Sequence, residues 1–171
     1  MSSMWKVMAL VGVVLMACFS GGCSSKPKMG RYTIEVSLDP SLANSARVPT
    51  IDVDLVAVQP ANEAQWESYD LGGYFAASDA LRMGAVRHVM QFGPGNTAPR
   101  SLNAGDDLWG SPSWSGARKV YVLANLPGGP QRLIIPLDTR HWEGGNRSTI
   151  RVQVQSASIS LLTQQKPLPV E

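Results

Sequence analysis

Cysteine is scarce in this sequence. Only two are present, Cys18 and Cys23, and both lie within the first 23 of 171 residues. The 148 residues after Cys23 therefore contain no thiol. This excludes a disulfide bond and a cysteine-ligated metal site from that part of the chain.

Motifs that carry catalysis are also missing. The sequence has no Gly-x-Ser-x-Gly elbow, no His-Glu-x-x-His and no glycine-rich phosphate loop. We expect His88 to be a packed imidazole within a strand, and His141 to lie near a surface turn. Asp106 and Asp107 form a carboxylate pair, but the further oxygens that Ca²⁺ needs are not visible. We therefore predict no enzyme activity, no metal site and no cofactor.

Long apolar runs and an excess of one charge are lacking as well. The apolar run at residues 7–17 spans 11 residues, against roughly 20 for a membrane-spanning helix. After Cys23 the chain has 14 Lys and Arg against 13 Asp and Glu, without a basic cluster in the sequence. We expect no transmembrane helix and no nucleic-acid partner, which would require a clustered basic face.

The N-terminal segment has the layout of an export signal. Lys6 precedes the apolar run, small residues follow it, and no acid occurs before Glu35. Ser20-Gly21-Gly22-Cys23 resembles the lipobox of bacterial lipoproteins, whose cysteine carries a diacylglycerol. We therefore predict a signal peptide at 1–22, a lipidated Cys23 with a flexible tether at 23–31, and binding to membrane lipid through the acyl chains.

Two alternatives to this interpretation stay open. Leu15-Met16-Ala17-Cys18 is a second lipobox candidate, with leucine three positions before the cysteine. The other alternative is an ordinary signal peptide with two incidental cysteines. Ser24 follows Cys23, and resemblance to proteobacterial sorting then implies the periplasmic face of the outer membrane.

Residues 32–163 show the pattern of a β-sandwich. Apolar residues alternate with polar ones in several short segments, and Gly- or Pro-rich turns separate these segments. Strands are predicted at 32–38, 51–59, 86–92, 119–126, 132–137, 149–155 and 157–163. A short helix is predicted at 63–70, and an edge strand could cross the long loop at 93–117. The prediction is an all-β, two-sheet β-sandwich of about seven or eight strands with a helical insertion, followed by a polar tail at 164–171.

Two tryptophans lie in the long loop. Trp109 and Trp114 could stack on sugars or on a protein partner, which would make the chain a carbohydrate- or cell-wall-binding lipoprotein. The alternative is that both indoles close one end of the sandwich.

The order of elements resembles the outer-membrane lipoprotein of bacterial type VI secretion systems. In that family, an acylated cysteine and a tether lead into a β-sandwich with a helical insertion. The best match runs from Val53 to Leu71, where a strand precedes an aromatic residue in a short helix. The first strand, from Tyr32, and its polar loop are also similar. Two features depart from the family pattern, namely Asn125 in place of an Arg and the length of the 93–117 loop.

The resemblance implies a structural adaptor. Such a protein tethers the periplasmic part of an inner-membrane protein to the outer membrane, through the loop between its first two strands. On this chain the loop is 41–48, and the implied contacts are Leu42, Asn44, Ser45 and Arg47. The alternative is that 41–48 is only a solvated connection between strands.

Overall fold

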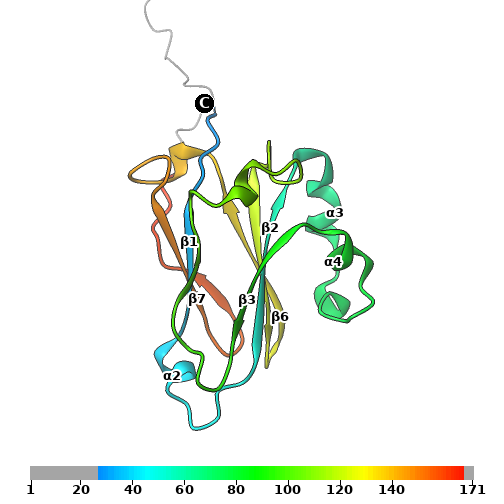
Figure 1. Ribbon diagram of the computed structural model, residues 1–171, viewed down its shortest axis with the longest axis vertical. Helices are drawn as coiled ribbons and strands as arrows, with labels where there is room; N and C mark the ends of the chain where they lie inside the picture. Colours follow the sequence, from blue (N-terminus) through cyan, green and yellow to red (C-terminus); the bar gives the residue numbers. More distant parts are fainter. Residues whose placement is uncertain (1–26, 168–171) are drawn as a thin grey trace, which may run out of the picture.

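The computed structural model describes residues 27–167, so the predicted signal peptide, Cys18 and Cys23 lie outside the described residues. Two four-stranded sheets pack face to face (Figure 1). The order of one sheet is β4-β1-β7-β8, and that of the other is β3-β2-β5-β6. The predicted all-β sandwich is therefore confirmed. The strands of the first sheet are β1 (Thr33–Leu38), β4 (Arg100–Leu102), β7 (Thr149–Val154) and β8 (Ile159–Leu161); those of the second are β2 (Ile51–Val58), β3 (Arg87–Phe92), β5 (Lys119–Leu126) and β6 (Gly129–Pro136).

The first strand of the chain lies inside its sheet rather than at an edge. β1 pairs antiparallel with β4 and parallel with β7, so that Ile34 lies beside both Leu102 and Ile150. The remaining strand pairs are antiparallel. Because β1 is hydrogen-bonded on both sides, the base of the tether is attached to the most protected part of the sheet.

The predicted alternation produces the main core. Ile34, Val36 and Ile150 project from one sheet and are fully buried, as are Leu55 and Val122 from the other. Burying each such side chain contributes about 1.5–3 kcal/mol relative to leaving it exposed. The two inner faces therefore hold the sheets together in the usual manner of a sandwich.

A helical insertion covers the outer face of the second sheet. It contains η1 (Pro60–Asn62), α3 (Glu63–Ser68), η2 (Leu71–Gly73) and α4 (Ala80–Gly84), which lie to one side of the strands in Figure 1. Trp66 and Tyr74 pack there against Val56, Tyr121 and Leu123 and form a second apolar cluster. The helix predicted at 63–70 is confirmed and ends two residues earlier. Three further short helices are α2 (Pro40–Ala43), η3 (Asp107–Gly110) and η4 (Thr139–His141).

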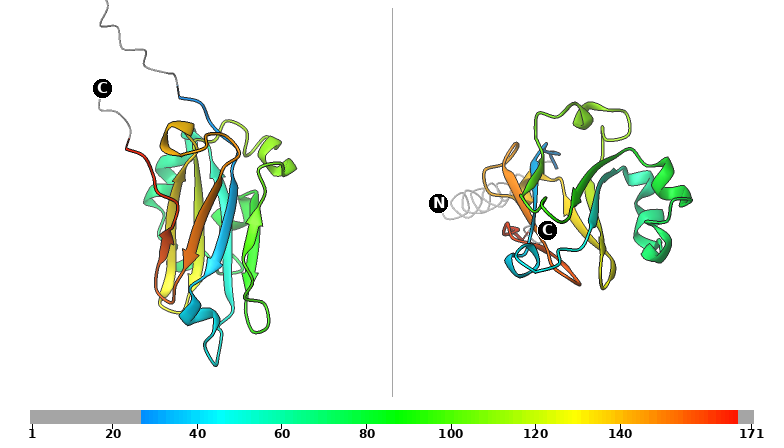
Figure 2. Two further views of the ribbon diagram at one scale, coloured as in Figure 1. Left: turned by 90° about the vertical axis from the view of Figure 1, so that its left-hand side faces the viewer. Right: turned by 60° about the horizontal axis from the view of Figure 1, so that its bottom comes forward.

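The two ends of the described chain lie at the same end of the sandwich, and α2 lies at the opposite end (Figures 1 and 2). The amide of Thr139 donates to the carbonyl of Lys28 at 2.9 Å, and the amide of Lys166 donates to the carbonyl of His141 at 2.8 Å. The tether and the C-terminal segment are thus both bound to the η4 region. Within residues 27–167, no helix is long and apolar enough to cross a membrane.

Candidate functional site

The loop between β1 and β2 begins as a capped helical turn. Asp39 Oδ1 accepts a hydrogen bond from the backbone amide of Ser41 at 2.9 Å, and Pro40 occupies the first helical position. Both features favour a helix start. The predicted polar connection therefore opens with the short helix α2 and continues as irregular backbone to Thr50.

The four predicted contact residues divide into surface and interior positions. Asn44 and Arg47 are exposed, and Ser45 is half-buried. Leu42 was expected to contact the partner, but it is 8% exposed and packs into the main core. The reason is that α2 turns its single large apolar side chain inward, which attaches the loop to the sandwich.

The side chains of Arg47 and Ser45 have no partner within residues 27–167. The guanidinium of Arg47 forms no hydrogen bond or ion pair there. Ser45 Oγ is buried without a hydrogen-bond partner. An exposed arginine on a loop that is anchored by a buried leucine suits a protein interface, because the backbone is positioned before binding.

Trp109 and Trp114 close one end of the sandwich. Of the two interpretations of these tryptophans, the structure therefore favours packing over ligand stacking. They are 4% and 2% exposed and belong to the main core. Their rings are perpendicular, with centroids 5.2 Å apart. The indole N–H groups donate to the carbonyls of Asn103 and Val86 at 3.0 and 2.9 Å. Neither ring offers an open face to a sugar, so the stacking hypothesis loses its structural basis.

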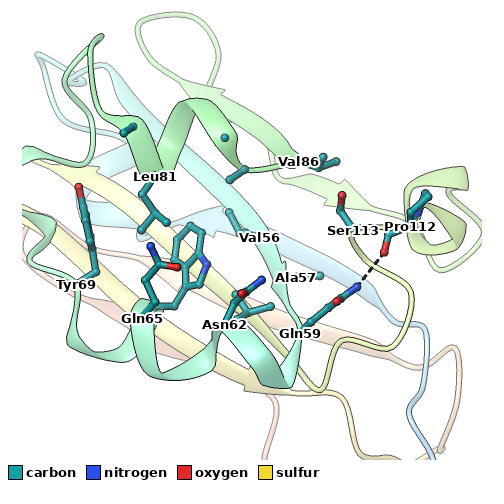
Figure 3. A pocket seen from close by; sticks show the side chains of 15 residues that line it. Val56, Ala57, Gln59, Asn62, Gln65, Tyr69, Leu81, Val86, Pro112 and Ser113 are labelled. Atoms are coloured by element: carbon teal, nitrogen blue, oxygen red, sulfur yellow. Dashed lines mark hydrogen bonds between the residues drawn. The ribbon is translucent and has the colours of Figure 1, made fainter.

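An open groove of about 660 Å³ lies between the helical insertion and the end of β2 (Figure 3). Its lining contains no charged side chain. Gln59 donates to the carbonyls of Pro112 and Ser115 at 2.9 and 3.0 Å, which fixes one wall. Asn62 and Gln65 follow on the same side (Figure 3). The groove is not apparent from the sequence, although Gln59, Asn62 and Gln65 follow one another at intervals of three residues, a spacing that favours one face of a helical segment.

The histidines and the carboxylate pair do not form a shared site. Asp106 caps η3 by accepting from the amide of Leu108 at 2.9 Å, which explains this acid structurally. His88 is half-buried, and burial lowers its pKa, opposed by the negative charge of Asp106. Within residues 27–167, no three His, Cys, Asp or Glu side chains are grouped as metal ligands would be.

No protein-family model matches the chain, and no curated protein sequence does. Several solved structures match it in fold. One is Lip of Serratia marcescens, described as a membrane-bound component of the type VI secretion system: 14% identity, TM-score 0.51, with 78% of this chain and 98% of that chain covered. Another is described as the C-terminal domain of the type VI secretion protein TssM from EAEC: 11% identity, TM-score 0.51, with 77% and 99% covered. A third is a type VI membrane complex: 15% identity, TM-score 0.51, with 79% and 99% covered.

The chain is a β-sandwich with a helical insertion, and these structures share its fold. At such low identity the likeness concerns the fold alone. The fold is the one found in type VI secretion membrane components, so the resemblance predicted from the sequence is confirmed at that level.

Proposed function

We propose that the chain is a lipid-anchored structural adaptor that tethers an inner-membrane component of a secretion complex to the outer membrane. Acylated Cys23 supplies the anchor, and the loop at 41–48 contacts the partner. The proposal is supported by the shared fold with a membrane-bound type VI secretion component of Serratia marcescens, and by the lipobox in the sequence.

The position of the loop is the observation that carries this proposal. The loop lies at the end of the sandwich opposite the tether (Figure 1). The six residues of β1 connect the two ends and span about 20 Å at 3.3 Å per residue. If the tether leads to a membrane, the loop points away from the bilayer, where a partner that comes from the opposite membrane can reach it.

The chemistry of the loop fits this role. Arg47 and Asn44 are exposed beside the buried anchor Leu42. Arginine is enriched among the residues that dominate binding energy at protein interfaces. We therefore expect Arg47 to supply most of the affinity that resides in this loop.

A pull-down from membranes tests the proposal. The full chain carries a tag at its C-terminus and is used as bait. The amount of the inner-membrane component of the same secretion system that is recovered with it is measured. Arg47→Glu combined with Asn44→Ala should reduce recovery of this component strongly. Arg118→Glu is the matched control, because Arg118 is also exposed and lies outside the loop, just before β5.

Two results would count against the proposal. Unchanged recovery with the altered loop would show that the partner binds elsewhere. Failure of the unaltered chain to recover this component would contradict the adaptor function itself.

A further inference from the structure

Cationic side chains gather at the end of the sandwich from which the tether leaves. Three segments meet there. The amide of Thr139 donates to the carbonyl of Lys28 at 2.9 Å, and the amide of Arg147 donates to the carbonyl of Arg31 at 2.8 Å. Lys166 joins the same region through the carbonyl of His141. We call this surface the basic end face; its cations are Lys28, Arg31, Arg140, Arg147 and Lys166.

The basic end face has an excess of positive charge. Its five cations are accompanied by two acids, Asp138 and Glu143, so its formal charge is +3. Asp138 pairs with Arg140 at 2.7 Å, and Glu143 pairs with Lys166 at 3.4 Å. The loop segment 39–50 at the opposite end contains one acid and one cation, and is formally neutral.

Three of the cations are exposed and unpaired. The side chains of Lys28, Arg31 and Arg147 are exposed, and within residues 27–167 they form no ion pair. Asp106 and Asp107 belong to the separate η3 loop. The unpaired positive charges of the basic end face thus come from the segment 28–31 and from Arg147.

The backbone at Arg147 is a second, independent observation. Its φ of 73° is the single positive value at a non-glycine residue within the described chain. Glycine or asparagine occupies this left-handed region with less strain than arginine does. The preceding Gly144 and Gly145 also have positive φ, at 80° and 63°. An exposed cationic side chain is thus held in a tight turn at some cost in backbone strain.

We propose that the basic end face docks on anionic phospholipid headgroups of the membrane to which the tether leads. This inference rests on the lipid anchor of the proposed function. Only four peptide units separate Cys23 from Pro27, and a chain of that length spans at most about 14 Å. Electrostatic attraction to a charged surface extends over roughly a Debye length, about 8 Å at physiological salt. The short tether keeps the face within or near this range.

Docking of this face would determine the orientation of the sandwich. Acyl chains alone leave a tethered domain free to tumble, whereas a charged face that contacts headgroups restrains it. The 41–48 loop would then point into the periplasm, toward its partner. The basic end face therefore adds orientation to the attachment that the lipid provides.

Energy transfer in vesicles tests the proposal. The acylated protein, produced from the full chain, is reconstituted in vesicles of phosphatidylethanolamine, with or without phosphatidylglycerol. Gln165→Cys supplies a unique thiol for a donor dye, because the chain has no cysteine after Cys23. Headgroup-labelled lipid is the acceptor. Transfer should rise when phosphatidylglycerol is present, and about 0.5 M NaCl should abolish the rise through screening.

Substitutions then identify the surface. Arg31→Glu with Arg147→Glu should abolish the rise, whereas Arg47→Glu should leave it intact. Arg147→Gly removes the charge at a position where glycine relieves backbone strain, so it should weaken the rise without loss of fold stability. Arg147→Lys keeps the charge and should preserve the rise.

The outcomes separate this inference from the function on which it rests. Equal transfer in both vesicle types, or a rise that survives both charge reversals, would overturn docking of the basic end face while the anchor stands. Failure of the unaltered protein to float with vesicles would overturn the anchor and the docking together. A normal rise combined with failed partner recovery would overturn the adaptor function and support the docking.

Discussion

Nε of Arg82 lies 2.8 Å from Oδ2 of Asp54, a carboxylate that has no exposure to solvent. Asp54 also accepts from the hydroxyl of Tyr74 at 3.2 Å, and Arg87 Nε lies 3.4 Å away. Burial raises the pKa of Tyr74, and the hydrogen bond to Asp54 raises the pKa of Arg82. This ionic cluster joins β2, the segment after η2, α4 and β3, and so fixes the helical insertion on its sheet.

Replacement of Asp54 should destabilise the fold. Asp54→Asn leaves the guanidinium groups of Arg82 and Arg87 without a countercharge in a largely buried setting. Removing one partner of a buried pair costs about 3–5 kcal/mol, and we expect the lower end because the two arginines are 20% and 28% exposed. Urea denaturation gives the free energy of unfolding. Asp52→Asn is the control: Asp52 is half-buried and accepts from Gln91 at 2.9 Å, which an amide oxygen can still do, so we expect a change within about 0.5 kcal/mol. Equal losses for the two variants would contradict the buried role.

Leu42 should contribute to stability rather than directly to partner binding. Leu42→Ala removes a side chain that is 8% exposed and packs in the main core. The expected loss is about 2–3 kcal/mol in the free energy of unfolding, within the range for leucine truncation in cores. Asn44→Ala, on the same loop but exposed, should change stability by less than about 0.5 kcal/mol. A stable Leu42→Ala protein that fails to bind its partner would show that Leu42 is a surface contact.

The sandwich was predictable because its strands alternate clearly. Ile34, Val36 and Val152 obey a period of two, and each faces the core. The same alternation places Asp54 on the face away from the core, but it contains no information on what covers that face. Whether the carboxylate of Asp54 is covered by helices or exposed to water depends on contacts between β2 and residues nearly thirty positions later, such as Arg82. Local patterns do not encode such contacts.

The candidate loop was only partly predictable for a related reason. Asp39-Pro40 follows the strand predicted at 32–38 and is typical of a strand end, although an Asp cap followed by Pro is equally a helix start. The helical turn then directs Leu42 inward, which spacing alone could not establish for a segment of four residues. Likewise, Trp109 and Trp114 lie in a glycine-rich loop, and only the fold shows that this loop turns their rings into the core.

Stability should fall at alkaline pH, partly through Tyr32. Its ring is fully buried, and burial together with the charge of Asp138 raises its pKa to about 12. In the unfolded chain the phenol of Tyr32 ionises near pH 10. The contribution of Tyr32 to the free energy of unfolding is therefore fully present below pH 10 and is lost as the pH rises toward 12. A shift of this size corresponds to at most roughly 3 kcal/mol.

Tyr32→Phe tests this pH dependence. The variant should lose less stability than the unaltered protein between pH 10 and 12, as measured by denaturation at each pH. Other tyrosines with raised pKa values, including Tyr74 and Tyr121, remain in both proteins, so the difference isolates Tyr32. Identical alkaline profiles would contradict a raised pKa at this residue.

Lipid attachment should depend on Cys23. Cys23→Ser should abolish incorporation of labelled fatty acid in bacterial cells, because a serine hydroxyl cannot replace the thiolate that takes the diacylglycerol. Cys18→Ser should keep the label, because in this interpretation Cys18 belongs to the removed signal peptide. Labelling that continues in Cys23→Ser and stops in Cys18→Ser would move the anchor to Cys18. That result would add five residues to the tether, to roughly 30 Å at full extension, and a tether of that length would no longer hold the basic end face close to the membrane.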